Sequence, residues 1–142
     1  MTLFTSSCYT SPHIEMEKTE LREIMEVLKA LSDEKRVRIL YALRSGELCV
    51  CQAIALLNLA PSTVSKHLKI LRAARLIDSR KNGRWMYYRL SKDCRVPSAG
   101  KLLCMLFNDM ESATVIAHDR KRLKLICREG REALCRKLFG KQ

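Results

Sequence analysis

The sequence lacks any apolar run near the roughly 20 residues that a membrane-spanning helix needs. Its first residues show neither the basic start nor the long apolar segment of a secretion signal, so we predict a cytoplasmic protein. Only 5 of the 142 residues are glycine, and no glycine-rich loop that could cradle a phosphate is present. No Cys-x-x-Cys occurs within an alternating strand–helix pattern either. These absences argue against a thiol enzyme, and we predict that the chain is not an enzyme.

Acidic residues are few for the number of basic ones. There are 15 Asp and Glu against 27 Lys and Arg, which gives a net charge of +12. Residues 1–34 hold three basic and seven acidic side chains, residues 35–117 fifteen and five, and residues 118–142 nine and three. Positive charge concentrated in one part of a chain is typical of proteins that bind nucleic acid. The alternative, a solvated basic surface, applies best to the last of these segments.

The number of cysteines is odd. Seven cysteines in a chain without a secretion signal argue against a complete disulfide framework. Reduced thiols or metal ligands are the favoured interpretation.

Apolar residues recur at helical spacing along most of the chain. We predict helices over residues 15–31, 33–44, 50–57, 61–74, 98–112 and 120–138, with Ser32 as the N-cap of the second and Gly130 as a weak point of the last. The predicted organisation is a flexible arm of residues 1–14, one folded domain of residues 15–112 and a basic, helical tail of residues 113–142.

The segment from Gly46 to Arg72 reads as two helices joined by a tight turn. In the second helix, Val64, Leu68 and Leu71 form one buried stripe. The remaining face is small, polar and basic, which suits contacts with base edges and phosphates. Its residues are Ser62, Thr63, Ser65, Lys66 and Lys69.

Residues 75–90 change to a strand-like pattern around Asn82-Gly83. Asn-Gly between two such runs predicts a β-hairpin, because both residues tolerate a positive φ. The tip carries Arg80, Lys81 and Arg84. A basic hairpin that follows a DNA-reading helix is a wing.

These motifs, in this order, resemble the ArsR/SmtB family of bacterial metalloregulatory repressors. The likeness covers about residues 20–112 and includes Ser62-Thr63-Val64-Ser65-Lys66-His67-Leu68 and Gly83-Arg84-Trp85-Met86-Tyr87-Tyr88. The resemblance implies a mainly α winged helix-turn-helix fold with a two-stranded β-hairpin wing. It also implies a homodimer, formed through the first and fifth helices, that binds double-stranded operator DNA and leaves it when a metal or metalloid binds.

Within the family, Glu47-Leu48-Cys49-Val50-Cys51 resembles the branch that senses arsenite and antimonite. The resemblance implies that Cys49 and Cys51 bind As(III) or Sb(III), with Cd, Pb or Zn as alternatives. It assigns Ser62, Thr63, Ser65, Lys66 and His67 to the recognition helix, and Arg80, Lys81 and Arg84 to the wing.

Two positions depart from the family pattern. Ile54 stands where the arsenite branch often has a third cysteine, and Arg75 stands where a glycine is common before the wing. The residues therefore do not identify the third metal ligand. Cys8 on the arm is the preferred candidate, and the others are Cys94, Cys104, Cys127 and Cys135.

The spacing of Cys49 and Cys51 sets a condition for binding one ion. Thiolates are soft ligands that suit these metals and metalloids, but residues i and i+2 of a regular helix point about 200° apart. Joint binding therefore needs non-helical backbone at the start of the helix. The alternative is that both cysteines simply pack as small apolar residues.

Three other classes of function compete with this one. A winged-helix repressor could sense oxidants through its cysteines, a thiol enzyme such as an arsenate reductase could use them in catalysis, and an architectural protein could bind any duplex through its basic tail.

Overall fold

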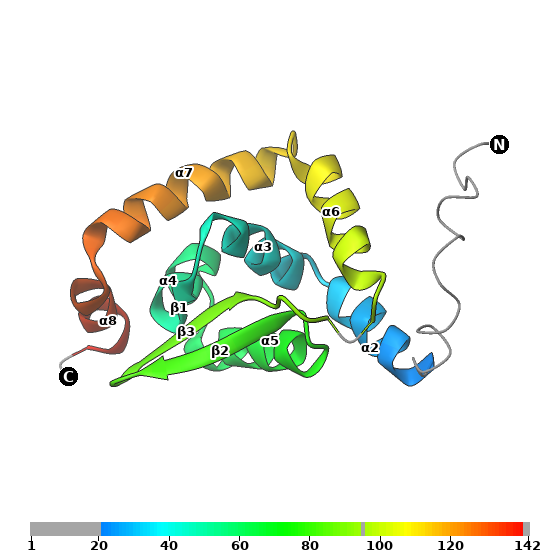
Figure 1. Cartoon of the computed structure of the whole chain (residues 1–142). Coiled ribbons are helices and arrows are strands. Elements are labelled where there is room, and N and C mark those ends of the chain that lie inside the picture. The colour runs from blue at the N-terminus through cyan, green and yellow to red at the C-terminus, as the bar shows by residue number, and fades with distance from the viewer. Residues whose placement is uncertain (1–20, 95, 141–142) are drawn as a thin grey trace.

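The computed structural model describes residues 21–94 and 96–140. The helices are α2 (Leu21–Leu31), α3 (Glu34–Ala42), α4 (Val50–Leu57), α5 (Pro61–Ala73), α6 (Ala99–Met110), α7 (Thr114–Glu129) and α8 (Arg131–Phe139), with a 3₁₀ turn η2 (Leu43–Ser45). The strands are β1 (Leu48–Cys49), β2 (Ile77–Asn82) and β3 (Trp85–Leu90). In Figure 1 the sheet lies beside α5, and α7 arches over α3 and α4 before α8 turns back toward the far end of the hairpin. Among the described residues, no helix is both long and apolar enough to cross a membrane.

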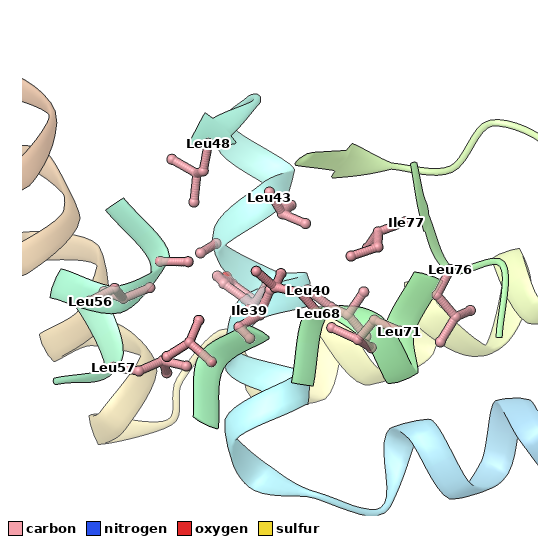
Figure 2. Close-up of a cluster of buried hydrophobic side chains, with 14 of the residues drawn as sticks. Ile39, Leu40, Leu43, Leu48, Leu56, Leu57, Leu68, Leu71, Leu76 and Ile77 are labelled. Atoms are coloured by element: carbon pink, nitrogen blue, oxygen red, sulfur yellow. The ribbon is translucent and has the colours of Figure 1, made fainter. Parts of the chain in front are cut away.

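The core lies where α3, α4 and α5 meet the sheet. The predicted stripe of Val64, Leu68 and Leu71 is buried in α5. Leu68 and Leu71 lie in the same cluster as Ile39 of α3 and Ile77 of β2 (Figure 2). The stripe orients α5, because burying these side chains leaves the opposite face of the helix in solvent.

The N-cap of α3 is Asp33 rather than the predicted Ser32. The Asp33 carboxylate accepts hydrogen bonds from the backbone N–H groups of Lys35 at 2.8 Å and Arg36 at 3.2 Å. The Ser32 hydroxyl donates instead to the carbonyl of Lys29 at 2.7 Å, at the end of α2. The prediction was wrong because two adjacent residues can both cap a helix, and here Ser32 is engaged by the helix that precedes it.

Asp33→Ala is expected to lower the free energy of unfolding by about 1 kcal/mol near neutral pH, the usual cost of losing an N-cap. Burial raises the pKa of Asp33, but hydrogen bonds from the backbone N–H groups of Arg36 and Lys35, together with the Arg36 charge, lower it by more. The pKa of Asp33 is therefore below its ordinary value. A lowered folded-state pKa means that the stabilisation is complete above the unfolded-state pKa near 3.9 and is lost as the pH falls through the folded-state value. Urea unfolding should therefore show a gap between the two proteins at pH 7 that shrinks near pH 2.5. An equal gap at both pH values would contradict this account.

The hairpin is present as predicted, and it belongs to a three-stranded antiparallel sheet of order β1-β3-β2. Asn82 pairs with Trp85 across the turn, where Gly83 has a φ of +63°. The sequence did not predict β1, which places Leu48 opposite Tyr88 and Cys49 opposite Tyr87. Two residues are too few to show the alternation by which a strand is recognised. The strand ties the Cys-x-Cys segment directly to the wing.

Arg75 adopts a left-handed conformation at the end of α5, with a φ of +62°. The N–H of Leu76 bonds to the carbonyl of Leu71 at 3.1 Å, and the N–H of Arg75 to that of Arg72 at 3.0 Å. This is the Schellman pattern, whose positive-φ position favours glycine. The structure thus gives a physical reason why a glycine is common at this position in the family.

Residues 114–139 form two helices that pack on the helix-turn-helix. The helical segment starts at Thr114, earlier than the predicted residue 120, and Gly130, with a φ of +85°, separates α7 from α8. The inner sides of the two helices are part of the hydrophobic core through Ile116, Leu123, Ile126 and Leu134. An ion pair fastens α7 to α3: Arg38 donates to the Asp119 carboxylate through Nε at 2.7 Å and Nη2 at 2.8 Å.

A second polar cluster holds the corner between α6 and α7. The Tyr41 hydroxyl donates to the Glu111 carboxylate, which also accepts from Arg120 at 3.1 Å and Arg44 at 3.3 Å. The hydrogen bond from Tyr41, together with the two guanidinium groups, lowers the pKa of Glu111 below its ordinary value. The α6–α7 corner and the second turn of α7 are thus held in place from α3 and η2.

Candidate functional sites

The outer face of α5 presents the polar residues that the sequence predicts for DNA contacts. Pro61 occupies the first turn, where its missing N–H leaves no bond unmade. The exposed side chains on this helix include Ser62, Thr63, Ser65, Lys66 and Lys69. The structure therefore brings these five residues onto one accessible surface.

His67 lies differently from its neighbours on α5. Its side chain is half-buried, and Nδ1 is 3.3 Å from Nη1 of Arg36. Arg36 also donates to the backbone carbonyl of Ala30 at 2.8 Å and to that of Lys29 at 3.0 Å. Through Arg36, His67 thus links α5 to the corner between α2 and α3. This contact holds the fold together.

The three predicted wing residues are not equivalent. Arg80 is held by Glu47, with Nε 2.8 Å from Oε2 and Nη2 2.6 Å from Oε1, and its guanidinium lies 4.7 Å from the centre of the Tyr87 ring. The hydrogen bond from Arg80 lowers the pKa of Glu47, so the carboxylate stays charged and offsets the charge of its partner. Lys81 and Arg84 are exposed. The accessible positive charge of the wing therefore lies at its tip.

A basic groove between the end of α5 and the sheet was missed by the sequence analysis. Its lining includes Lys69, Arg72, Arg75 and Arg89, with Asp78 as the acidic member. Lys69 and Arg72 come from the end of α5, Arg75 follows its C-cap, Asp78 belongs to β2 and Arg89 to β3. The sequence does show that basic residues continue past Lys69, at Arg72 and Arg75. Only the fold shows that Arg89 of the hairpin lies beside them.

The Cys-x-Cys segment has the local backbone that joint binding would need. Cys49 is the N-cap of α4 in an extended conformation, with φ −83° and ψ 161°, and Cys51 lies in the first turn. Both side chains are buried, with 0% and 2% of their surface exposed. They nevertheless face different partners.

Cys49 lies beside α7. Gln52 links the two elements, because its Oε1 accepts from the Cys49 N–H at 2.9 Å and its Nε2 lies 3.8 Å from the Cys127 sulfur. Burial and the nearby Cys49 thiol raise the pKa of Cys127. Cys49 and Cys127 are both free cysteines.

Cys51 forms a disulfide with Cys135 of α8, with the two Cα atoms 5.9 Å apart. The odd number of cysteines favoured reduced thiols, and nothing local in the sequence predicts this pairing. The break at Gly130 explains it, because α8 turns back toward α4 and brings together residues that are 84 positions apart. Within residues 21–94 and 96–140, no group of three or more His, Cys, Asp or Glu side chains is arranged to hold a metal ion.

The other candidate ligands lie elsewhere. Cys104 is exposed on α6, and Cys94 is half-buried after β3, where burial and the charges of Asp78 and Asp93 raise its pKa. Cys8 lies outside the described residues.

Comparison with known proteins gives a consistent assignment. A family model described as bacterial regulatory protein, arsR family, matches residues 33–79. The arsenical resistance operon repressor of Bacillus subtilis is 38% identical over 88 residues, which cover 61% of this chain and 84% of that protein. The chain belongs to the ArsR family.

Other ArsR-related proteins resemble shorter portions. The arsenic resistance transcriptional regulator ArsR1 of Pseudomonas putida is 43% identical over 74 residues, 49% of this chain and 58% of that protein. The cadmium resistance regulatory protein CadC homolog of Staphylococcus aureus is 36% identical over 80 residues, 56% of this chain and 66% of that protein. The chain thus spans about three fifths of the length of the first curated relatives that it matches.

Solved structures support the winged helix-turn-helix fold. HlyU from Vibrio cholerae superimposes with a TM-score of 0.55 at 28% identity, covering 64% of this chain and 95% of that one. NolR from Sinorhizobium fredii does so with a TM-score of 0.55 at 30% identity, covering 72% and 96%. The family and its curated members are described as regulators, in agreement with the prediction that the chain is not an enzyme.

Proposed function

We propose that this chain is a metal- or metalloid-responsive transcriptional repressor that binds double-stranded operator DNA as a homodimer and is released when As(III) or Sb(III) binds cysteine thiolates. The observation that carries the proposal is the position of Cys49 and Cys51 at the start of α4, the helix that packs directly against α5. A ligand bound there acts on the element that supports the DNA-reading surface.

The DNA-binding part of the proposal is supported by accessible charge. Polar and basic side chains are exposed on α5, in the basic groove between the end of α5 and the sheet, and at the wing tip with Lys81 and Arg84. Such side chains are suited to contacts with base edges and phosphates. His67 and Arg80 contribute less directly, because Arg36 and Glu47 engage them.

The homodimer is supported by apolar side chains that the single chain leaves in solvent. On α2, Leu21, Met25 and Leu28 are 73%, 42% and 47% exposed, and Met105 on α6 is 63% exposed. These helices correspond to the first and fifth helices, which the family resemblance implies as the dimer interface. Apolar residues gathered on two helices favour a protein–protein contact.

The inducer part of the proposal uses thiolate chemistry. Cys49 and Cys51 are the proposed ligands, with Cys8 as the candidate third, and Cd, Pb or Zn are the alternative ions because thiolates bind all of them. An inducer releases DNA only if it binds better to a conformation that fits DNA poorly. Drawing two buried thiols toward one ion would displace the first turn of α4, and the α5 surface with it.

The test is operator release under reducing conditions. Fluorescence anisotropy with an inverted-repeat duplex should show tight binding that arsenite or antimonite reverses at stoichiometric levels, because each chain supplies one thiol site. Cys49→Ser and Cys51→Ser should remain bound at concentrations that release the unmodified protein, whereas Cys104→Ser, a change at an exposed cysteine of α6, should behave normally. Full release of either serine variant at α4 would contradict the ligand assignment.

The Cys51–Cys135 disulfide favours a second candidate, a repressor that responds to thiol oxidation. In that case diamide without any metal should release the DNA, and a thiol reductant should restore binding. DNA affinity that is the same in the oxidised and reduced protein would rule this candidate out.

A further inference from the structure

Each cysteine of the Cys-x-Cys motif faces a cysteine from the last two helices. Cys49 lies near Cys127 of α7, with Gln52 between them, and Cys51 is bonded to Cys135 of α8. The motif therefore does not point both sulfur atoms at one position. It divides between two helices that lie outside the segment matched by the family model.

We propose that Cys135 is the thiolate partner of Cys51 for the thiophilic inducer, so that the bound ion joins α4 to α8 within one chain. The inference rests on the proposed function: Cys51 stays a ligand, Cys135 of α8 takes the place given to Cys8 of the N-terminal arm, and Cys49 joins them when the first turn of α4 moves. The geometry supports it, because the Cα atoms of the two residues are 5.9 Å apart and their sulfur atoms already meet.

A cavity of about 430 Å³ opens beside this pair. Its lining includes Cys51, Cys135, Trp85, Glu132 and Phe139. Cys51 is buried and Cys135 is half-buried, and both line the cavity, so a small solute can approach the pair from there. The Cys49–Cys127 pair does not contribute to the lining.

The chemistry balances with one named co-reactant. A small thiol reductant gives two electrons and two protons to the Cys51–Cys135 disulfide and becomes a disulfide itself, which leaves two free thiols. Arsenous acid then exchanges two of its hydroxyl groups for the two sulfur atoms and releases two molecules of water, with no change in the oxidation state of arsenic. The oxidised pair cannot bind arsenite, so reduction is required first.

Contacts between α8 and the wing allow an ion bound at Cys135 to affect the DNA-binding surface. The Arg131 guanidinium lies 5.3 Å from the centre of the Tyr87 ring and 5.8 Å from that of Trp85. Glu132 lies 3.9 Å from the Arg84 guanidinium. A shift of α8 as it accommodates the ion would therefore move against the same hairpin that carries the basic tip.

The experiment is a map of cysteine protection on the full chain. The protein is reduced with a phosphine, which adds no competing thiol, incubated with one equivalent of arsenite, pulsed with N-ethylmaleimide and analysed by peptide mass spectrometry. We expect Cys51 and Cys135 to be protected by arsenite, while Cys104 reacts as fast as it does without arsenite.

Cys135→Ser should weaken arsenite binding at least about tenfold, since even groups that only support a ligand cost about that much. Cys104→Ser is the matched control, and thermal melting of both variants checks that they fold. Protection of Cys49 and Cys51 with Cys135 left reactive, or protection of Cys8 in its place, would overturn the assignment while leaving the proposed function intact. If arsenite, antimonite and cadmium protect no cysteine and release no DNA, the proposed function fails together with this inference.

Discussion

Asp119→Ala is expected to lower the free energy of unfolding by about 3 kcal/mol, because removing one member of a buried ion pair leaves the other charge uncompensated. The side chains of Arg38 and Asp119 are only 12% and 9% exposed, and two hydrogen bonds of 2.7 and 2.8 Å join them. Without Asp119, Arg38 keeps Glu34 as its acidic partner among the residues that the structure describes, at 3.7 Å and with the Glu34 side chain 65% exposed. Such an exposed carboxylate compensates a buried guanidinium poorly.

Urea unfolding at pH 7 measures the effect, with Asp109→Ala as the matched control. Asp109 is an exposed aspartate on α6, and its replacement should change the stability by less than about 0.5 kcal/mol. The double variant Arg38→Ala/Asp119→Ala should be more stable than the sum of the two single changes predicts, because no unpaired charge is then buried. Equal stability of Asp119→Ala and Asp109→Ala would show that α7 does not depend on this pair.

The stability of this pair matters for function because Arg38 and Asp119 hold α7 against α3, and α8 follows directly after α7. The pair and the Tyr41–Glu111 cluster hold the first half of α7 on α3, and Leu123 and Ile126 continue the contact along the helix. The orientation of α7 then determines where α8 begins after Gly130. If the inducer site includes Cys135, weakening this anchor should also lower arsenite affinity, although Asp119 touches neither cysteine.

The sequence predicted the helix-turn-helix and the hairpin because their signals are local. Val64, Leu68 and Leu71 recur within two turns of one helix, and Asn82-Gly83 marks the hairpin turn by its own conformational preference. The third strand and the N-cap of α3 were missed for different reasons. β1 is too short to show a pattern, and the choice between Ser32 and Asp33 depends on what α2 already binds.

The thiol site could be predicted only in part, since its partners lie far apart in sequence. Cys49 and Cys51 are candidate ligands because the segment from Glu47 to Cys51 resembles the arsenite-sensing branch of the family, but nothing local shows that Cys135 meets Cys51 across 84 positions. The same holds for the wing, where Glu47 precedes β1 and neutralises Arg80 of β2. Long-range pairs such as these depend on how the helices and strands pack, which periodicity does not report.

The double variant Lys66→Gln/Lys69→Gln is expected to weaken operator binding on the order of 1,000-fold at 0.1 M salt. Both lysines are exposed on α5, beside the basic groove that Lys69 helps to line. Each phosphate that a lysine neutralises contributes about 0.9 to the slope of log affinity against log salt, so a dimer that loses four such contacts should lose about 3.6 from that slope. The change removes the charge and leaves a polar side chain at two exposed positions, so the core beneath the helix should be unaffected.

Anisotropy titrations over a range of salt concentrations measure both quantities, and Lys121→Gln/Lys124→Gln on α7 is the matched control. These two lysines are also exposed and carry the same charge, but they belong to the C-terminal helices. If DNA lies on α5 and the wing, the control should keep the salt slope of the unmodified protein, because charge on α7 then contacts no phosphate. A slope that falls in the control and not in the α5 variant would move the DNA-binding surface to the C-terminal helices, and would favour an architectural nucleic-acid binder over an operator-reading repressor.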